Sequence, residues 1–453
     1  MESSPIAAII LAAGQGTRMK SDLHKVLHPI AGRPMLLHLI DSVDRAGATH
    51  RIVVVGKGRE QIEAAVADRG VTTALQADQL GTAHAALQAR DALAGFDGVA
   101  LVCFGDTPFL SSETIAAMAA RLSAVDQPRI AVLGFRPPEA KAYGRILAET
   151  DGTITKMVEY KDANAAERAV DLCNSGVTAV RAADLWPLLD RVGNDNAAGE
   201  YYLPDIVMLA LADGDRAVVV ETDPDEVIGI NSRAELAYAE DRWQTARRTR
   251  MMDDGASMIA PETVWFAWDT RVGRDVTIEP NVFFGPGVSI ADGATIHAFS
   301  HIEGATIGAG AEVGPFARLR PGAVMGEKSK IGNFVEMKKA VLGKGAKANH
   351  LTYLGDAEIG AGANIGAGTI TCNYDGFFKY KTQIGAGAFI GSNSALVAPV
   401  SIGAGAIVGA GSVITADVEA DALAIARGKQ EARPGRAKRF REVMAAKKAA
   451  AKK

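Results

Sequence analysis

The sequence predicts two architectures in one chain, an open, doubly wound (Rossmann-like) α/β domain and, after a connecting helix, a parallel β-helix of hexapeptide repeats. The α/β prediction rests on short apolar runs that alternate with amphipathic segments from Ile6 to about Ile230. The β-helix prediction rests on apolar residues that recur at every sixth position from Arg271 to about Thr415. A period of six fits neither an α-helix nor an ordinary strand, but it fits one short strand plus one tight corner.

The amino-terminal elements follow in order along the chain. Four apolar runs have the character of strands buried in parallel sheets, namely Ile6–Leu11, Ile52–Val55, Val99–Phe104 and Ile130–Phe135. The segments between them are amphipathic, and we expect helices at Met35–Ala46, Glu60–Asp68, Ala83–Leu93 and Ser112–Leu122. A charged run without turn residues predicts the connecting helix. The expected division is therefore 1–231 for the first domain, 232–252 for the linker helix and 253–453 for the β-helix with its tail.

The hexads hold their phase over long stretches. One unbroken run extends from Val272 to Ile302 and a second from Ile384 to Ile414, and a slip of one residue resets the phase at Ile307. A flexible linker rich in Gly and Ala has no reason to keep such a phase. We expect the apolar residue of each hexad to point into a narrow core, with small residues at the corners.

Composition and charge exclude several classes of protein. The chain of 453 residues is long enough for two or three domains, and its apolar content of 48% and charged content of 23% are ordinary for folded, soluble protein. A net charge of −4 argues against a nucleic-acid-binding protein, and we interpret the basic tail from Arg433 to Lys453 as a solvated helix rather than a nucleic-acid arm. Three widely spaced cysteines, and no signal peptide or membrane span, predict a cytoplasmic protein without membrane or nucleic-acid partners.

A Gly-rich turn directly follows the first predicted strand. The segment from Leu11 to Met19 would present backbone N–H groups to an anion, and Arg18 would add a fixed positive charge. The segment is neither a Walker A motif nor a Rossmann fingerprint, so a purely structural turn is the alternative. Asp106 lies just beyond another buried strand, at the edge where α/β sheets place ligands. Asp106 and Asn231 offer the hard oxygens that Mg²⁺ prefers, although either residue could instead belong to a turn or a helix cap.

The hexad rhythm is weakest from Val335 to Tyr380, where polar residues gather. Repeat proteins place insertions on a binding face, so this stretch is a candidate site. His350 is the best candidate for a base, because a neutral imidazole accepts a proton near neutral pH; a structural histidine is the alternative. Arg320 and Lys338 suit a phosphate dianion or are solvated charges at coil corners.

Several motifs resemble those of one family in the same order. The segments are Leu11–Met19 with Lys25 and Pro29, Gln76–His84, Phe104–Pro108, Tyr143–Arg145, Val158–Tyr160, Asn174–Gly176, Gly229–Asn231 and His350–Asp356. With the hexads they resemble the bifunctional bacterial GlmU family, an N-acetylglucosamine-1-phosphate uridylyltransferase fused to a glucosamine-1-phosphate acetyltransferase. The resemblance covers nearly the whole chain and implies a left-handed β-helix. Gln15 is a departure, because the family commonly has Lys there, which puts a role of position 15 in triphosphate binding in doubt.

The resemblance implies roles for residues of the first domain. Arg18 and Lys25 would neutralise the α-phosphate of UTP and the attacking sugar phosphate, and Asp106 and Asn231 would ligate Mg²⁺. Uracil would be read by Gln76, Gly81, Thr82 and the backbone of Leu11, Ala12, Ala13 and Gly14, while Phe104 and Gly105 also bind substrate and Gly144, Glu159 and Asn174 hold the sugar. No residue would act as a covalent nucleophile, because the sugar phosphate attacks UTP directly.

The resemblance also implies a second set of roles in the β-helix. His350 would be the general base. Arg320, Lys338, Tyr353 and Asn364 would surround the sugar phosphate, and acetyl-CoA would contact Ala367, Asn373, Tyr374, Ser392, Ala410 and Arg427. We interpret Cys372 as a packing residue, because direct attack of the amine on the thioester needs no acyl carrier. A slim β-helix gains stability against copies of itself, and the resemblance implies a homotrimer whose acetyltransferase sites lie between neighbouring chains.

The resulting prediction is a bifunctional enzyme of cell-envelope precursor synthesis. It would acetylate glucosamine 1-phosphate with acetyl-CoA and then join N-acetylglucosamine 1-phosphate to UMP from UTP. Two alternatives from other classes stay open: a sugar-1-phosphate nucleotidylyltransferase whose β-helix is structural or regulatory, and a non-catalytic binding scaffold.

Overall fold

The computed structural model describes residues 4–140, 142–196 and 198–451. The chain forms two compact units, Met1–Ala246 and Arg247–Lys453. The division falls within one helix, α8 (Arg233–Asp253), in the region where the sequence predicts a charged connecting helix. The predicted boundaries at 231 and 252 stay predictions. No helix within the described ranges combines the length and apolar character needed to cross a membrane.

The first unit is built on a mixed sheet with the strand order β11-β7-β10-β6-β1-β4-β5. The strands of this unit are β1 (Ile6–Leu11), β2 (Pro29–Ile30), β3 (Arg33–Pro34), β4 (Ala48–Val55), β5 (Thr72–Leu75), β6 (Val99–Phe104), β7 (Ile130–Phe135), β8 (Arg145–Ala148), β9 (Ile154–Val158), β10 (Cys173–Arg181) and β11 (Ala217–Thr222). The helices that precede α8 are α1 (Met35–Arg45), α2 (Arg59–Val66), α3 (Thr82–Leu87), α4 (Ser112–Arg121), α5 (Ala165–Arg168), α6 (Ala182–Leu189) and α7 (Asp205–Ala212).

Apolar side chains on both faces of this sheet make two separate cores. Ile10, Val53 and Leu101 point to one face, and Ile9, Ile52 and Val102 point to the other. All six side chains are buried, which is why these strands read as unbroken apolar runs in the sequence. The expected α/β layering is therefore confirmed.

Strands β8, β9 and β10 depart from the expected parallel pairing, and β10 lies within the main sheet. β10 runs antiparallel to both β6 and β7. The polar segment Asn174–Gly176 interrupts its apolar run, so alternation alone did not predict this strand. Its insertion between β6 and β7 has a consequence for the site, because Asn174 and Gly176 then lie beside Phe104 at the end of β6.

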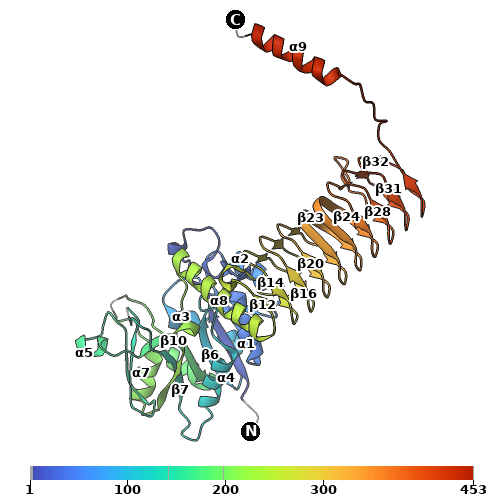
Figure 1. Ribbon diagram of the computed structural model, residues 1–453. Helices are drawn as coiled ribbons and strands as arrows, with labels where there is room; N and C mark the ends of the chain where they lie inside the picture. Colours follow the sequence, from blue (N-terminus) through green and yellow to red (C-terminus); the bar gives the residue numbers. More distant parts are fainter. Residues whose placement is uncertain (1–3, 141, 197, 452–453) are drawn as a thin grey trace. The chain divides into compact units, whose positions relative to one another are not determined.

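The second unit is a parallel β-helix (Figure 1). Most of its strands are only two or three residues long. Its strands are β12 (Ser257–Met258), β13 (Arg271–Val272), β14 (Thr277–Ile278), β15 (Phe283–Phe284), β16 (Ser289–Ile290), β17 (Thr295–Ile296), β18 (His301–Ile302), β19 (Ala305–Ile307), β20 (Glu312–Val313), β21 (Arg318–Leu319), β22 (Ala323–Met325), β23 (Lys330–Leu342), β24 (Lys347–Ile359), β25 (Asn364–Ile365), β26 (Ile370–Cys372), β27 (Thr382–Ile384), β28 (Phe389–Ile390), β29 (Ala395–Val397), β30 (Val400–Ile402), β31 (Ile407–Val408), β32 (Val413–Ile414) and β33 (Leu423–Ala424). The basic tail carries helix α9 (Arg436–Ala450), whose residues are exposed.

The pairing register explains the period of six. Arg271 pairs with Ser289 and Thr277 with Thr295, so three hexads make one coil. The hexad residues point inward, and from Ile278 to Ile414 the apolar residues that hold the phase are buried. The hexapeptide β-helix prediction, with its left-handed form, is confirmed.

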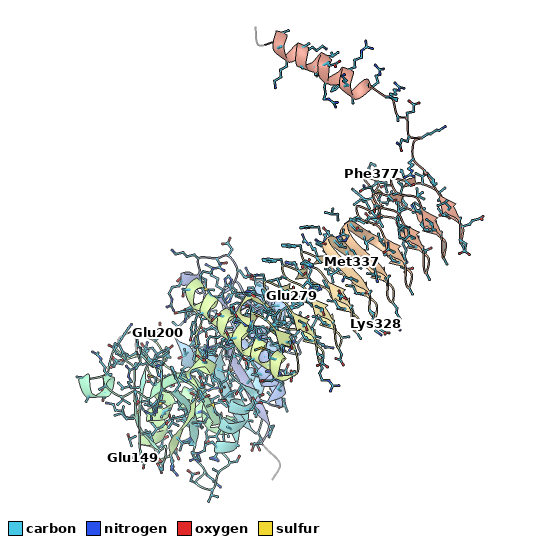
Figure 2. All side chains as sticks on the ribbon, in the orientation of Figure 1. Glu149, Glu200, Glu279, Lys328, Met337 and Phe377 are labelled. Atoms are coloured by element: carbon cyan, nitrogen blue, oxygen red, sulfur yellow. The ribbon has the colours of Figure 1, made fainter. Side chains whose placement is uncertain are left out.

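One coil is longer than the others. Ala357 pairs with Thr382, 25 positions further on, because the residues around Tyr374 to Lys379 leave the coil as a loop. Met337 lies inside the β-helix, whereas Phe377 lies on this loop and is 86% exposed (Figure 2). The structure thus has its irregular coil within the stretch where the sequence loses its rhythm.

Candidate active sites

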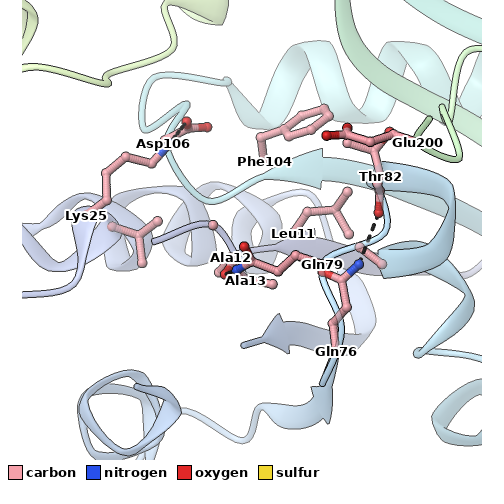
Figure 3. Close-up of a pocket in the computed structure, with 14 residues that line it drawn as sticks. Leu11, Ala12, Ala13, Lys25, Gln76, Gln79, Thr82, Phe104, Asp106 and Glu200 are labelled. Atoms are coloured by element: carbon pink, nitrogen blue, oxygen red, sulfur yellow. Dashed lines mark hydrogen bonds and ion pairs between the residues drawn. The ribbon is translucent and has the colours of Figure 1, made fainter. Parts of the chain in front are cut away.

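The Gly-rich turn after β1, the segment that follows β5 and the end of β6 enclose a cavity of about 270 Å³. It is lined by Leu11, Ala12, Ala13, Gly14, Lys25, Val26, Gln76, Gln79, Gly81, Thr82, Ala85, Phe104, Asp106 and Glu200. Lys25 and Asp106 lie at one end of this cavity, and Thr82 and Glu200 lie at the other (Figure 3). Most of the residues that the sequence predicts for nucleotide binding thus meet in one place.

A second cavity of about 670 Å³ shares Thr82, Phe104 and Glu200 with the first. It is lined by Thr82, Phe104, Ala142, Tyr143, Gly144, Glu159, Tyr160, Lys161, Asn174, Ser175, Gly176, Glu200, Tyr202 and Pro204. The predicted sugar-binding residues Gly144, Glu159 and Asn174 all lie here. Two joined cavities suit a ligand with two parts, such as a nucleotide joined to a sugar.

The charged end of the first cavity brings together residues from three distant segments. The Lys25 ammonium donates hydrogen bonds to Asp106 Oδ2 at 2.5 Å and to Asn231 Oδ1 at 3.1 Å. Asp106 follows β6, and its carbonyl accepts a hydrogen bond from the Ile230 N–H at 3.0 Å, which holds the segment of Asn231 beside it. Ser232, rather than Asn231, caps α8, because its Oγ accepts from the Glu235 N–H. The Asn231 side-chain oxygen therefore faces the cation.

This arrangement bears on a metal site. The Asp106 carboxylate and the Asn231 amide oxygen already hold the Lys25 ammonium between them. Both are ligand types that Mg²⁺ takes. Within the described residues no group of three or more His, Cys, Asp and Glu side chains could enclose a metal. Such a sparse site is the kind in which waters and substrate phosphates complete the coordination of Mg²⁺.

The end of the first cavity near Thr82 and Glu200 depends on a backbone conformation that requires glycine. Gly81 has φ +114° and ψ 178°, and a Cβ there would lie 2.5 Å from Tyr201 O. The Tyr201 backbone makes hydrogen bonds to residues on either side of Gly81. Its carbonyl accepts from the Ala83 N–H, and its N–H donates to Leu80 O. The Gln76 side chain, itself buried, donates to Gly81 O at 3.1 Å. These contacts bring Glu200 to the cavity wall.

The sugar end carries a carboxyl group with an altered pKa. Burial raises the pKa of Glu159, and the carboxylates of Asp205 and Asp162 raise it further. Asn174 is buried, and its backbone N–H donates to Gly144 O at 2.9 Å. A partly buried carboxyl group opposite a fixed amide can pair with sugar hydroxyl or N-acetyl groups.

Some predicted residues lie away from the cavities. Arg18 is exposed on the short 3₁₀-helix Thr17–Met19, lines neither cavity and makes no ion pair with the described residues. Gly105 also lines neither cavity; its N–H donates to Leu11 O and so ties β6 to the Gly-rich turn. The sequence reasoning missed Gln79, although it lies within the Gln76–His84 motif, and it missed Glu200, which no sequence pattern marks.

In the β-helix, four predicted residues lie on successive coils at one corner. Ala348, Ile365, Ile390 and Val408 pair in succession, and each of them is followed two positions later by a predicted residue, namely His350, Ala367, Ser392 and Ala410. Arg427 donates to Ala410 O at 2.6 Å, so it lies at the end of the same corner. The predicted base and most predicted acetyl-CoA residues therefore follow one edge of the coil.

Asn333 fixes the orientation of the His350 ring. His350 Nδ1 lies 3.0 Å from Asn333 Oδ1. An amide oxygen only accepts hydrogen bonds, so Nδ1 carries the proton and the lone pair is on Nε2. Asn333 was not predicted, because it bears no chemistry of its own.

A cluster of cations lies on the adjacent face. Glu336 pairs with Tyr353 across β23 and β24, and Arg320 donates to Glu336 Oε1 at 2.8 Å. Lys379 approaches Lys338 so closely that it lowers the pKa of the Lys338 ammonium, and Arg320 contributes to the same effect. Cations this close favour a bound dianion between them. Lys379, on the loop of the longer coil, is a residue that the sequence reasoning missed.

The remaining acetyltransferase residues lie nearby. Asn373 is buried and donates to Asp356 Oδ2 at 2.5 Å, while Tyr374 is 59% exposed. Asn364 lies on β25, paired with Lys347 of β24. Burial raises the pKa of the half-buried Cys372 thiol, which does not favour a thiolate nucleophile.

Comparisons with known proteins agree with this division. Residues 8–150 match the model of the MobA-like NTP transferase domain, and residues 269–304 and 381–416 match that of the bacterial transferase hexapeptide (six repeats). The chain is 66% identical over 451 residues to the Bifunctional protein GlmU of Sphingopyxis alaskensis and 68% identical over 452 residues to that of Rhizorhabdus wittichii, covering 100% of both chains in each case. It is 60% identical to the protein of the same name from Zymomonas mobilis, covering 97% of this chain and 98% of that one. The chain therefore belongs to the GlmU family of bifunctional transferases, in which an NTP transferase domain precedes hexapeptide repeats.

Proposed function

We propose that the chain makes UDP-N-acetylglucosamine in two steps. The β-helix unit transfers the acetyl group of acetyl-CoA to the amine of glucosamine 1-phosphate. The amino-terminal unit then transfers the uridylyl group of UTP to N-acetylglucosamine 1-phosphate and releases pyrophosphate. The observation that carries the second step is the pair of joined cavities with the Lys25, Asp106 and Asn231 cluster at one end.

In the uridylyl step, an oxygen of the sugar phosphate attacks the α-phosphorus of UTP while the bond to pyrophosphate breaks. Two polyanions must approach each other, so positive charge at the cavity supplies much of the catalysis. Lys25 lies where it can pair with a phosphate oxygen, and the exposed Arg18 can neutralise the nucleotide from the loop. Asp106 and Asn231 would hold Mg²⁺, which supplies charge neutralisation of the phosphates when bound.

In the acetyl step, His350 acts as the general base. Its Nε2 takes a proton from the amine, whose nitrogen attacks the thioester carbonyl, and the CoA thiolate leaves. Arg320, Lys338 and Lys379 are the cations that would hold the phosphate of the sugar. The corner that carries Ala367, Ser392 and Ala410 offers an extended edge for acetyl-CoA.

We also propose that the active form is a homotrimer. Phe299, Phe316, Phe334 and Leu351 form an apolar ladder on successive coils, with exposed fractions of 54, 46, 57 and 61% and positive φ throughout. Adjacent phenylalanine rings stack with centroids 5.0 and 5.3 Å apart. Exposed apolar side chains on strained backbone favour a surface that a second copy covers.

The trimer has a direct test. Phe316→Asp places a charge in the middle of the ladder and is expected to yield monomers in sedimentation velocity. Phe283→Asp is the matched control, because Phe283 is 45% exposed but lies outside the ladder. A Phe316→Asp protein that stays trimeric would exclude the ladder as the interface. A cytoplasmic location stays a prediction.

The function itself is tested by two product assays on the purified chain. With UTP, N-acetylglucosamine 1-phosphate and Mg²⁺, pyrophosphate release is expected. With glucosamine 1-phosphate and acetyl-CoA, release of free CoA is expected. Pyrophosphate release without CoA release would support the alternative of a single nucleotidylyltransferase with a structural β-helix. The absence of both products would support the binding scaffold.

A further inference from the structure

The Lys25 ammonium lies between the two proposed metal ligands and makes a hydrogen bond to each of them (Figure 3 shows its approach to Asp106). The Lys25 and Asp106 side chains are only 13% and 17% exposed, so this ion pair is shielded from much of the solvent. We propose that Lys25 is an internal cation that occupies the divalent-metal position before nucleotide binds, and that the metal enters only when Lys25 leaves. This inference rests on the proposed uridylyltransferase site.

The two cations exclude each other for a geometric reason. Mg²⁺ needs its oxygen ligands at about 2.0–2.1 Å, and an ammonium group in hydrogen-bond contact with the same two oxygens fills that space. Since Asp106 and Asn231 are the two protein ligands proposed here, the metal has to compete with Lys25 for both at once. The repulsion between a divalent cation and a nearby ammonium adds to this competition.

A nucleotide relieves the competition. Phosphate oxygens are strong acceptors for an ammonium group, and Lys25 lines the same cavity as the Gly-rich turn that faces the triphosphate. Gly16 of that turn packs on the Lys25 stem, because a Cβ at Gly16 would lie 2.9 Å from Lys25 Cγ. When Lys25 turns to a phosphate, Asp106 and Asn231 become free and the nucleotide brings further oxygens for the metal. Metal and nucleotide then bind with positive cooperativity.

The test measures metal binding directly, without turnover. Mn²⁺ serves as the probe, and the free ion is quantified by electron paramagnetic resonance in titrations of the full chain without nucleotide. Lys25→Met is expected to bind Mn²⁺ at least about tenfold more tightly than the wild type, the gain that follows if Lys25 occupies the site in about nine of ten molecules. Lys25→Arg keeps the charge and is expected to bind no more tightly than the wild type.

Two controls separate the possible explanations. Lys57→Met removes an exposed lysine that makes no ion pair with the described residues, and it is expected to leave Mn²⁺ affinity unchanged. With a non-hydrolysable UTP analogue present, the advantage of Lys25→Met is expected to vanish or reverse, since Lys25 then pairs with phosphate. If Lys25→Met bound Mn²⁺ more tightly only because it has lost a positive charge, this advantage would persist with the nucleotide analogue present.

The outcomes distinguish this inference from the proposed site. If Asp106→Asn abolishes the Mn²⁺ binding of the Lys25→Met protein but Lys25→Met binds no more tightly than the wild type, the inference is wrong and the metal site stands. If Mn²⁺ binding does not depend on Asp106 in either background, the proposed metal site itself is wrong.

Discussion

Replacement of Gly81 by alanine tests how the nucleotide cavity is built. At φ +114° and ψ 178°, Gly81 lies in a backbone region that only glycine adopts readily. Any other residue in this conformation costs about 1–3 kcal/mol. The new Cβ would also lie 2.5 Å from Tyr201 O and 2.7 Å from Tyr201 N, both backbone atoms that cannot rotate away. Displacing Tyr201 would break its hydrogen bonds to Leu80 and Ala83, each about 1 kcal/mol. We therefore expect a total loss of about 3–5 kcal/mol.

The assay combines stability and activity. Urea unfolding of Gly81→Ala is compared with that of Gly58→Ala, which has φ +81° and nothing near its Cβ, so that only about 1–2 kcal/mol of backbone cost is expected. Because Tyr201 is flanked by the cavity residue Glu200, uridylyl transfer should fall with the stability, whereas acetyl transfer in the other unit should persist. If Gly81→Ala is no less stable than Gly58→Ala and keeps its uridylyl transfer, the reasoning about this loop is wrong.

Three further predictions concern single side chains. Asn333→Ala removes the partner that orients His350, so kcat of acetyl transfer is expected to fall about tenfold while uridylyl transfer is unchanged; an unchanged kcat would exclude the positioning role. Lys379→Met should raise KM for glucosamine 1-phosphate about tenfold, because only Arg320 and Lys338 remain to hold the phosphate. An unchanged KM in the CoA-release assay would contradict this. Burial raises the pKa of Glu159 above its ordinary value of 4.5, so ionising it costs the folded state stability as pH rises above 4.5. Glu159→Gln is therefore expected to unfold at a higher temperature than the wild type at pH 7 and to lose this advantage near pH 4.5, although its sugar binding is weaker; a lower melting temperature at pH 7 would refute this.

Periodic features of the fold could be predicted from the sequence. The hexads report burial directly, because the apolar residues that keep the period of six from Ile278 to Ile414 are buried in the β-helix. The strands β1, β6 and β7 were predictable for the same reason, since both of their faces are buried. The antiparallel β10 was not, because pairing direction depends on contacts between distant strands.

The sites were predictable where a residue carries its own chemistry. Asp106 and His350 are charged or reactive side chains at points where a strand ends or the hexad rhythm weakens, and Lys25 is a charged residue within a family motif. Glu200 and Asn333 reach the candidate sites through backbone contacts and strand register, which no local sequence pattern marks.

The central claim is that one chain carries two independent sites, and reciprocal single variants test it most directly. Both activities are measured on the same preparations of Asp106→Ala and His350→Ala. Asp106→Ala is expected to lose pyrophosphate release and keep CoA release, and His350→Ala is expected to do the opposite. If His350→Ala keeps its acetyl transfer, or if either variant loses both activities while folded, the account of two separate sites is contradicted.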